Sequence, residues 1–283
     1  MGTVLLFPGQ GSQKLGMGSE VFETFLDLIG QADQILGYSV KNLCLEDPEK
    51  RLDQTQYTQP ALFIVSSLTY LARVRSAEKP PPEFAAGHSV GEYAALFAAG
   101  VFDFITGVQL TQKRGEIMSR AQGGGMAAVI GLPPLRIEEL LRNFAFDTID
   151  VANFNSPRQT VISGPIADIE EATPIFQESG ARMVIRLKVS AAFHSRHMAD
   201  ASREFGEFLQ GFEFQAPSFP VISNLEARPY EISRARQILT DQIRHPVRWI
   251  DSIQYLVAQG GSVFEETGPG NVLTQLVAQI RKP

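Results

Sequence analysis

The chain has 283 residues, of which 44% are hydrophobic and 20% charged, a composition typical of a folded globular enzyme. Its formal net charge of -6 argues against nucleic acid as a partner, because binding to phosphates requires a basic face. The single Cys44 excludes an internal disulfide bond, and the four histidines suggest no metal-ligand cluster, so no metal site is expected. No apolar run approaches the ~20 residues of a membrane span, which predicts a cytoplasmic protein without a membrane partner.

Apolar periodicity and turn residues divide the first 123 residues into predicted elements. They are, in chain order, a buried strand over 4–7, a glycine-rich turn over 8–13, a helix over 19–36, an irregular polar segment over 43–58, an apolar helix that begins at Pro60 and ends at Val74, a proline linker over 80–82, a short apolar strand over 84–86, a helix over 92–99 and a helix from Asp103, its N-cap, to about residue 121. We interpret this part as the beginning of an α/β core.

The pattern changes after the glycine run at 123–125. The elements predicted beyond it are a strand over 126–130, a helix over 134–144, strands over 148–153 and 159–163 around an Asn-Ser-Pro turn, a helix over 167–179 and a strand over 182–189. This β-α-β-β-α-β order predicts a ferredoxin-like subdomain over 124–190, inserted into a core formed by 1–123 and 191–283. The core is expected to resume with strands at 221–222 and 262–265 and to end with a helix over 272–280.

Residues 87–91, Gly-His-Ser-Val-Gly, match the pattern G-x-S-x-G between a predicted strand and a predicted helix. This context is typical of a nucleophile elbow, in which a sharp turn exposes a serine hydroxyl at the edge of the sheet. The two glycines remove side chains that would collide at the turn, and the following helix N-terminus favours negative charge near Ser89. Because the pattern also occurs by chance, a structural Gly-Ser turn is the alternative.

Five segments in the expected order resemble the malonyl-CoA:acyl carrier protein transacylase family. They are Phe7–Gln13, Gly87–Leu96, Gln112–Glu116, Ala192–Ser195 and Gly268–Leu273. The resemblance extends from residue 4 to about 280 and implies an α/β-hydrolase-like core with a parallel sheet plus an inserted ferredoxin-like subdomain. The Ala-Phe-His-Ser run looks like that of the discrete, trans-acting acyltransferases of polyketide synthases.

The resemblance implies that Ser89 is the nucleophile and that His194 is the base that takes its proton. His197, one helical turn further on, is a weaker candidate for the base. His88 is expected to line the site or to have a structural role, because neighbours on a tight turn usually point apart. His245 precedes a proline and is expected to be a loop residue.

In this family a main-chain carbonyl, rather than a carboxylate, orients the histidine. The matching segment is interpreted as Pro246–Trp249, which assigns the acceptor to the carbonyl of Arg248, where family members commonly have glutamine. Asn155 either lines the site or forms an Asx-turn. The backbone amides of Gln10 and Val90 are the expected oxyanion-hole donors, because one lies in a glycine-rich turn at a strand end and the other directly follows the nucleophile.

Arg114 indicates the substrate class. On the helix from Asp103 it shares one face with Gly107, Thr111 and Met118, at spacings of three and four. A buried arginine among small and apolar residues requires an anionic partner, and the carboxylate of a malonyl group can accept two hydrogen bonds from a guanidinium. An exposed helical arginine without a role in the site is the alternative.

Phe193, beside the base, leaves little room for a 2-methyl group and favours malonyl over methylmalonyl, although Ala191 stands where polyketide malonyl enzymes often have histidine. The resemblance implies transfer of a malonyl group from malonyl-CoA to the phosphopantetheine thiol of an acyl carrier protein through a malonyl-Ser89 ester, in polyketide or fatty acid biosynthesis. No permanently bound cofactor is expected, because coenzyme A is part of the substrate and phosphopantetheine belongs to the partner. An acyl hydrolase that clears carrier proteins and a non-catalytic docking partner within a synthase are the alternatives.

A monomer is expected, with exposed cations that receive an acidic carrier protein or the phosphates of coenzyme A. The candidates are Lys113, Arg120, Arg182, Arg186 and Lys188. Solvated surface charges without a partner are the alternative for each of them.

Overall fold

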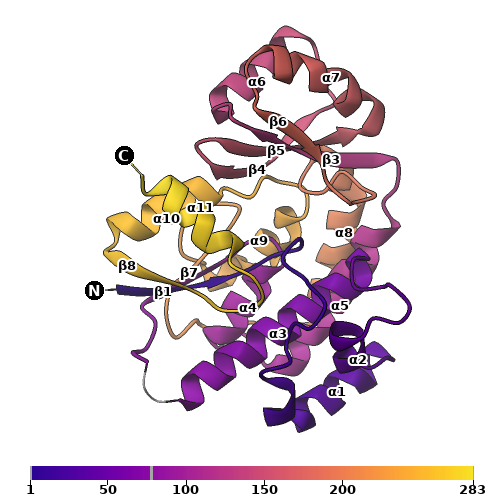
Figure 1. Cartoon of the computed structure of the whole chain (residues 1–283). Helices are drawn as coiled ribbons and strands as arrows, with labels where there is room; N and C mark the ends of the chain where they lie inside the picture. Colours follow the sequence, from indigo (N-terminus) through magenta and orange to yellow (C-terminus); the bar gives the residue numbers. More distant parts are fainter. Residues whose placement is uncertain (1, 77–78, 283) are drawn as a thin grey trace.

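The computed structural model describes residues 2–76 and 79–282. The chain forms two β-sheets, each covered by helices, and Figure 1 shows the smaller part above the larger one. We refer to residues 124–190 as the insert and to the other described residues as the core. In the described part of the chain, no helix is both long enough and apolar enough to span a membrane.

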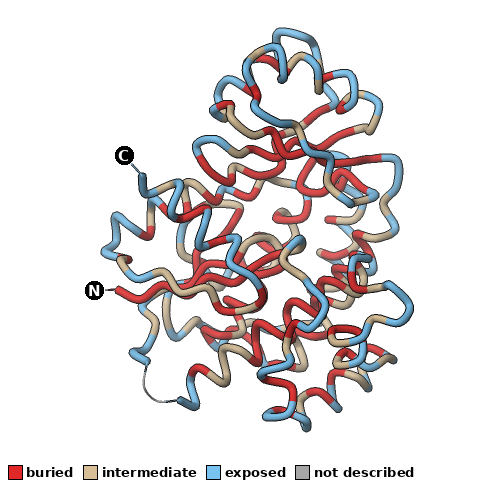
Figure 2. The backbone as a smooth tube through the Cα atoms, in the orientation of Figure 1, coloured by how far each residue is buried: buried red, intermediate tan, exposed pale blue. Residues whose placement is uncertain are grey.

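The core contains a four-stranded parallel sheet in the order β7-β2-β1-β8. Its strands are β1 (Gly2–Phe7), β2 (Phe84–Gly87), β7 (Val221–Ile222) and β8 (Gly261–Glu266). Every residue of β1 is buried, as the apolar run over 4–7 predicts for a strand of a parallel sheet, and Figure 2 shows this strand in the colour of buried residues. The carboxyl ends of parallel strands share one edge of the sheet, so the loops that follow them meet there.

Two hydrophobic clusters lie on the two faces of this sheet. Leu5 and Phe7 of β1 join the larger cluster, whereas Val4 and Leu6 join the smaller one, as the alternation of side chains along a strand requires. The helices of the core are α1 (Leu26–Leu36), α2 (Val40–Leu45), α3 (Thr55–Arg75), α4 (Gly91–Ala98), α5 (Phe104–Arg120), α8 (Ala199–Leu209), α9 (Ala235–Gln242), α10 (Trp249–Ala258) and α11 (Val272–Ile280).

The insert has its own sheet and its own hydrophobic cluster. Its elements are β3 (Gly124–Ile130), α6 (Pro134–Asn143), β4 (Asp150–Ser156), β5 (Gln159–Pro165), α7 (Ile166–Glu178) and β6 (Met183–Arg186). The strand order is β4-β5-β3-β6 and every pair is antiparallel, which is the ferredoxin-like arrangement that the sequence predicted.

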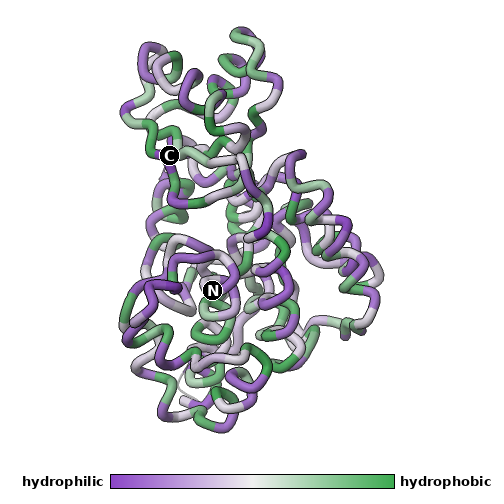
Figure 3. The backbone as a smooth tube through the Cα atoms, turned by 90° about the vertical axis from the view of Figure 1, so that its right-hand side faces the viewer, coloured by the Kyte–Doolittle hydropathy of each residue, from purple (hydrophilic) through white to green (hydrophobic). Residues whose placement is uncertain are grey.

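The insert is hydrogen-bonded to the core along β4. The amide of Phe154 donates to the carbonyl of Val247 at 3.0 Å, and the amide of Val247 donates to the carbonyl of Ala152 at 2.9 Å. In a view from the side, the insert lies above the core, and hydrophilic and hydrophobic residues alternate along the outer helices, as expected when one face of a helix is buried (Figure 3).

Two predicted helix starts are wrong. The apolar helix begins at Thr55, and Pro60 lies inside α3. Because proline has no amide hydrogen, the carbonyl four residues earlier lacks a helical hydrogen bond, and the helix tolerates this single loss. The first long helix begins at Leu26 rather than at residue 19, because Phe25 has non-helical backbone angles of φ -131° and ψ 40°. The segment predicted to be irregular over 43–58 also contains the end of α2 and the beginning of α3.

Candidate active site

Ser89 lies in the sharp turn between β2 and α4, as the nucleophile-elbow pattern predicts. Its φ of 52° is in the left-handed region, which non-glycine residues rarely adopt. A Cβ atom on Gly87 would lie 2.0 Å from the carbonyl carbon of Gly91, and one on Gly91 would lie 2.1 Å from the carbonyl oxygen of Phe7. Only glycine therefore fits at these two positions.

The hydroxyl of Ser89 and the imidazole of His194 are in hydrogen-bonding contact, with 2.8 Å between Oγ and Nε2. On the other side of the ring, Nδ1 lies 2.8 Å from the carbonyl oxygen of Gln242 and 3.2 Å from that of His245. Because a carbonyl oxygen only accepts, Nδ1 carries the hydrogen and Nε2 offers its lone pair to the serine.

His194 is buried, with 4% of its surface exposed. Burial and, next, the positive charge of Arg114 lower the pKa of His194 to about 3. The imidazole is therefore neutral at neutral pH and can accept a proton from the serine hydroxyl.

The prediction that the carbonyl of Arg248 orients His194 is wrong. Arg248 is the N-cap of α10, and its carbonyl accepts hydrogen bonds from the amide and the hydroxyl of Ser252, at 3.0 and 2.9 Å. The acceptor is Gln242, the last residue of α9. It is a glutamine, as the resemblance led us to expect, but it lies earlier in the chain.

Arg114 is fully buried on α5, so the alternative of an exposed helical arginine is wrong. Its Nη1 donates to Oε1 of Gln59 at 2.8 Å. Its Nη2 donates to Oε1 of Gln242 at 2.9 Å and to Oγ of Ser89 at 3.2 Å. Among the described residues, no carboxylate forms an ion pair with this guanidinium. A positive charge is thus held next to the serine hydroxyl without a paired anion.

The side chain of Asn224, which follows β7, supports the backbone of the elbow. Its Oδ1 accepts from the amide of Ser89 at 2.7 Å, and its Nδ2 donates to the carbonyl of Gly87 at 2.6 Å. The backbone amide of Asn224 donates to the carboxyl group of Glu92 at 2.7 Å, and the hydroxyl of Tyr230 also donates to that carboxyl group. Burial raises the pKa of Glu92 to about 7. Sequence reasoning missed Asn224, although two polar residues directly after a buried strand, here Ser223 and Asn224, are a recognisable signal.

The two amides predicted to form an oxyanion hole belong to neighbouring loops. The turn after β1 packs on the elbow, since a Cβ atom on Gly9 would lie 2.3 Å from the carbonyl oxygen of His88. The side chain of Gln10 donates to Thr55 at 3.1 Å, and Val90 is the N-cap of α4. Within residues 2–76 and 79–282, the backbone amides of Gln10 and Val90 donate no hydrogen bond, which leaves both available to a ligand.

The other predicted site residues lie around this centre. Nε2 of His88 is 2.8 Å from Oδ1 of Asn155, so this side chain contacts the residue beside the serine rather than forming an Asx-turn. Phe193 is buried in the larger hydrophobic cluster of the core. His197 is exposed and hydrogen-bonds the carbonyl of Thr148, away from Ser89.

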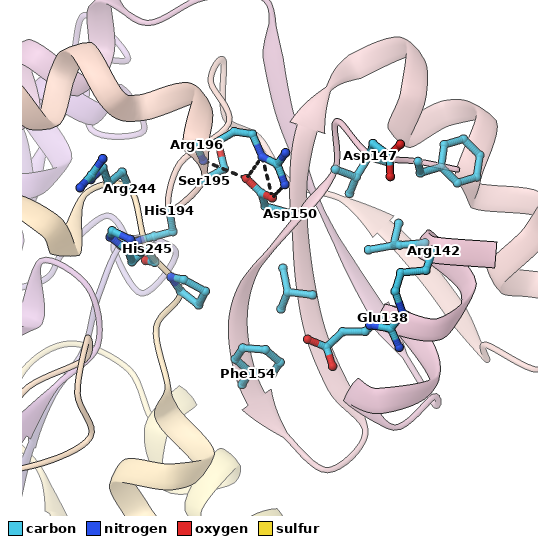
Figure 4. A pocket seen from close by; sticks show the side chains of 15 residues that line it. Glu138, Arg142, Asp147, Asp150, Phe154, His194, Ser195, Arg196, Arg244 and His245 are labelled. Atoms are coloured by element: carbon cyan, nitrogen blue, oxygen red, sulfur yellow. Dashed lines mark hydrogen bonds and ion pairs between the residues drawn. The ribbon is translucent and has the colours of Figure 1, made fainter. Parts of the chain in front are cut away.

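A cavity of about 670 Å³ opens between the core and the insert and reaches His194 (Figure 4). The core side is formed by residues 194–196 and 244–246, and the insert side by α6, β4 and the loop between them. Arg196 and Asp150 form an ion pair across it. Ser89 is not among the described residues that line this cavity. In the described ranges, no group of three or more His, Cys, Asp or Glu side chains is arranged to hold a metal ion.

Comparisons with known proteins agree with this geometry. The family model "acyl transferase domain" matches residues 4–282. The polyketide biosynthesis malonyl CoA-acyl carrier protein transacylase BaeC of Bacillus velezensis is 55% identical over 277 residues, which cover 98% of this chain and 96% of that protein. A solved malonyl CoA-acyl carrier protein transacylase from Burkholderia pseudomallei is 46% identical, with a TM-score of 0.96, and the match covers 100% of this chain and 99% of that one.

A second solved structure bears on the partner. It contains a type II PKS acyl-carrier protein in complex with its malonyl-transacylase; the matched chain is 34% identical, with a TM-score of 0.94, over 99% of this chain and 93% of that one. The chain belongs to the acyl transferase domain family and, within it, to the malonyl-CoA:acyl carrier protein transacylases that its motifs resemble.

Proposed function

We propose that this chain transfers a malonyl group from malonyl-CoA to the phosphopantetheine thiol of an acyl carrier protein in polyketide biosynthesis. The observation that carries the proposal is the buried, unpaired guanidinium of Arg114, with its Nη2 3.2 Å from Oγ of Ser89. In a malonyl-serine ester, two carbon–carbon bonds separate the ester carbonyl from the free carboxylate, which brings that carboxylate within reach of the guanidinium. The name of the relative at 55% identity supports the same substrate and the same pathway.

In the first half-reaction, Oγ of Ser89 attacks the thioester carbonyl of malonyl-CoA while Nε2 of His194 takes the hydroxyl proton. The negative oxygen of the tetrahedral intermediate accepts hydrogen bonds from the amides of Gln10 and Val90. The carbon–sulfur bond then breaks, His194 returns the proton to the leaving sulfur, and coenzyme A departs from the malonyl-Ser89 ester.

The second half-reaction reverses these steps with a new thiol. The phosphopantetheine sulfur of the carrier protein attacks the ester carbonyl while His194 takes its proton. The bond to Oγ breaks, Ser89 regains a proton from His194, and malonyl-carrier protein leaves. Arg114 holds the malonyl carboxylate in both half-reactions, and the bulk of Phe193 disfavours a 2-methyl branch.

The carrier protein is proposed to bind near the chain segment that follows β6. Arg186 and Lys188 line a second surface cavity of about 670 Å³ together with Thr55, whose hydroxyl accepts the hydrogen bond from Gln10. Of the five candidate cations, Lys113, Arg120 and Arg186 form exposed ion pairs, which are weak enough to be exchanged for an acidic partner. A cytoplasmic location and a monomeric state remain predictions.

The test is to incubate the protein with malonyl-, methylmalonyl-, acetyl- and butyryl-CoA and to measure the mass added to Ser89. Holo-acyl carrier protein is then added, and the mass transferred to it is followed. The proposal expects a malonyl adduct in preference to the others, and its quantitative transfer to the carrier protein. A release of free malonate that is faster than this transfer would instead support the acyl hydrolase, in which Arg114 has no task. A failure of Ser89 to become acylated by any donor would contradict enzyme activity.

A further inference from the structure

The guanidinium of Arg114 is held by two glutamines. Oε1 of Gln59, on α3, accepts from Nη1 at 2.8 Å, and Oε1 of Gln242, at the end of α9, accepts from Nη2 at 2.9 Å. Both glutamine residues are buried, with 1% exposed. The guanidinium carbon also lies 5.6 Å from the centre of the Tyr93 ring. The position of the cation is therefore fixed by uncharged groups on three helices, α3, α4 and α9.

The hydrogen bonds of the two glutamine side chains determine that their oxygens, rather than their NH₂ groups, face the guanidinium. Nε2 of Gln242 donates to the carbonyl of Ser89 at 3.1 Å, and Nε2 of Gln59 lies 3.4 Å from Sδ of Met118. Each NH₂ group thus has a partner of its own, and each amide oxygen accepts from Arg114. Gln242 also connects the cation directly to the backbone of the serine.

A neutral partner is unusual for a buried arginine, because a buried charge is normally paired with an opposite charge. The carboxyl group of Glu92 is buried close enough to interact electrostatically with Arg114, yet it accepts hydrogen bonds from Asn224 and Tyr230 rather than from the guanidinium. Burial raises the pKa of Glu92 to about 7, so this carboxyl group is only partly ionised at neutral pH. A carboxylate on the guanidinium would cancel its charge and occupy its donors. Amide oxygens orient the same donors and leave the charge uncancelled.

We propose that Gln59 and Gln242 are positioning residues that determine substrate specificity: they hold Arg114 with uncharged oxygens, so that its charge is satisfied only by the carboxylate of the acyl group. The proposal rests on the proposed malonyl transfer and adds the source of its selectivity. Malonyl preference then depends on the neutrality of two side chains that need not touch the reacting carbonyl.

The decisive variant is Gln59→Glu, which keeps the size of the side chain and adds a resident carboxylate. Among the described residues, the Gln59 side chain hydrogen-bonds only Arg114 and Met118, so this variant leaves the contacts of Ser89 and His194 intact. The expected result is a loss of about 10²–10³-fold in kcat/KM for malonyl-CoA, since two carboxylates then compete for one buried cation. Transfer of an acetyl group, which has no carboxylate, is expected to be largely retained.

Gln242→Glu is the second variant. It is expected to lower malonyl transfer at least as much, and to lower acetyl transfer as well, because Gln242 also donates to the carbonyl of Ser89. Gln59→Leu removes the acceptor without adding charge and should give a smaller selective loss than Gln59→Glu. The matched control is Gln237→Glu, an exposed position on the same helix α9, which should leave both activities and the malonyl-to-acetyl ratio unchanged.

A double variant of Gln59 and Arg114 distinguishes an effect on specificity from a structural defect. In an Arg114→Ala background, Gln59→Glu should produce no further change in the malonyl-to-acetyl ratio, because the cation it neutralises is gone. An equal loss of malonyl and acetyl transfer in Gln59→Glu, or an unchanged ratio in a folded variant, would overturn the proposal. If Gln59→Glu does not fold, as judged by thermal unfolding, the malonyl-to-acetyl ratio of Gln59→Leu decides, and a ratio equal to that of the unmodified protein would overturn the proposal. Absence of malonyl transfer by the unmodified protein would instead contradict the proposed function itself.

Discussion

The parallel sheet of the core and the antiparallel sheet of the insert differ in where their strands end. In the core, all carboxyl ends lie at one edge, so the loops after β1, β2 and β7 bring Gln10, Ser89 and Asn224 together. In the insert, neighbouring strands run in opposite directions and their ends alternate between two edges. The insert therefore contributes contacts from the edge strand β4 rather than a set of converging loops.

The polar contacts of the two regions also differ in burial. Those around Ser89 in the core involve side chains that are nearly inaccessible to water, whereas the ion pair of Arg196 with Asp150 has side chains that are 63% and 21% exposed. A hydrogen bond in a dry environment costs more to break than an exposed ion pair. Variants in the core should thus have large effects on the reaction, and variants at the contact with the insert small ones.

The largest effect is expected from His194→Ala, which removes the proton acceptor of Ser89. The rate of malonyl-Ser89 formation should fall by roughly 10⁴–10⁶-fold, as when one member of a coupled nucleophile–base pair is removed. Quenched-flow mass spectrometry of the intact protein measures this rate. His197→Ala is the control, because that exposed imidazole bonds only to the carbonyl of Thr148 among the described residues, and its rate should equal that of the unmodified protein. Retention of the rate in His194→Ala would assign the base elsewhere.

Arg114→Ala is expected to have the next largest effect, and a selective one. Loss of the buried cation should lower kcat/KM for malonyl-CoA by about 10²–10³-fold, because the carboxylate is then desolvated without a partner. Acetyl-CoA should be affected much less. Steady-state transfer to holo-acyl carrier protein from each donor checks this ratio, and equal losses for the two donors would remove Arg114 from substrate binding.

The dry surroundings of His194 also predict how acylation depends on pH. Between pH 6.5 and 4.5, the neutral fraction of an ordinary histidine falls about fiftyfold. Because burial and Arg114 lower the pKa of His194 to about 3, its neutral fraction should stay nearly constant over that range. The unfolded chain binds more protons there than the folded one, so this histidine makes stability fall as the pH is lowered from 6.5 towards 3. A pH titration of the acylation rate with an inflection near 6.5 that is lost in His194→Ala would contradict the prediction.

A smaller loss is expected from Asn224→Ala. The variant leaves the amide of Ser89 and the carbonyl of Gly87 without their side-chain partner, which frees the elbow to leave its strained backbone conformation. Turnover should fall by about tenfold, and the melting temperature should also fall, since buried polar groups become unpaired. Asn143→Ala, at an exposed asparagine at the end of α6, is the matched control for both measurements. A normal turnover in a destabilised Asn224→Ala protein would limit the role of Asn224 to folding.

Whether a feature depends on contacts between neighbouring residues or between distant ones explains what the sequence could predict. The elbow, the cap at Asp103 and the bounds of α11 depend on neighbouring residues, so glycine spacing and apolar periodicity were sufficient to place them. The order of elements in the insert follows from the same local patterns. The two helix starts were predicted wrongly for different reasons. Apolar spacing extends before Phe25, but the backbone there is not helical, and Pro60 looks like a helix start although α3 accommodates it in its interior.

The contacts that sequence reasoning missed join residues far apart in the chain. Asn224 is 135 positions from Ser89, and Gln242 is 128 positions from Arg114, so no local spacing connects them. The acceptor for His194 was assigned to Arg248 because a backbone carbonyl has no side-chain signature: any residue of that segment could provide one. The resemblance supplied the kind of group, and only the fold determined which residue brings it to the imidazole.

The smallest effect is expected where the insert meets the elbow. Asn155→Ala removes the acceptor of His88 at 2.8 Å, the side-chain contact through which β4 reaches the residue beside Ser89. A single hydrogen bond between uncharged groups is worth about 1 kcal/mol, so the acylation rate should fall only a few-fold. Asn155→Asp, which keeps the acceptor oxygen, should restore most of that loss. A decrease as large as that of Arg114→Ala would mean that the insert takes part in the chemistry through Asn155, and the separation of the two regions would then no longer describe this site.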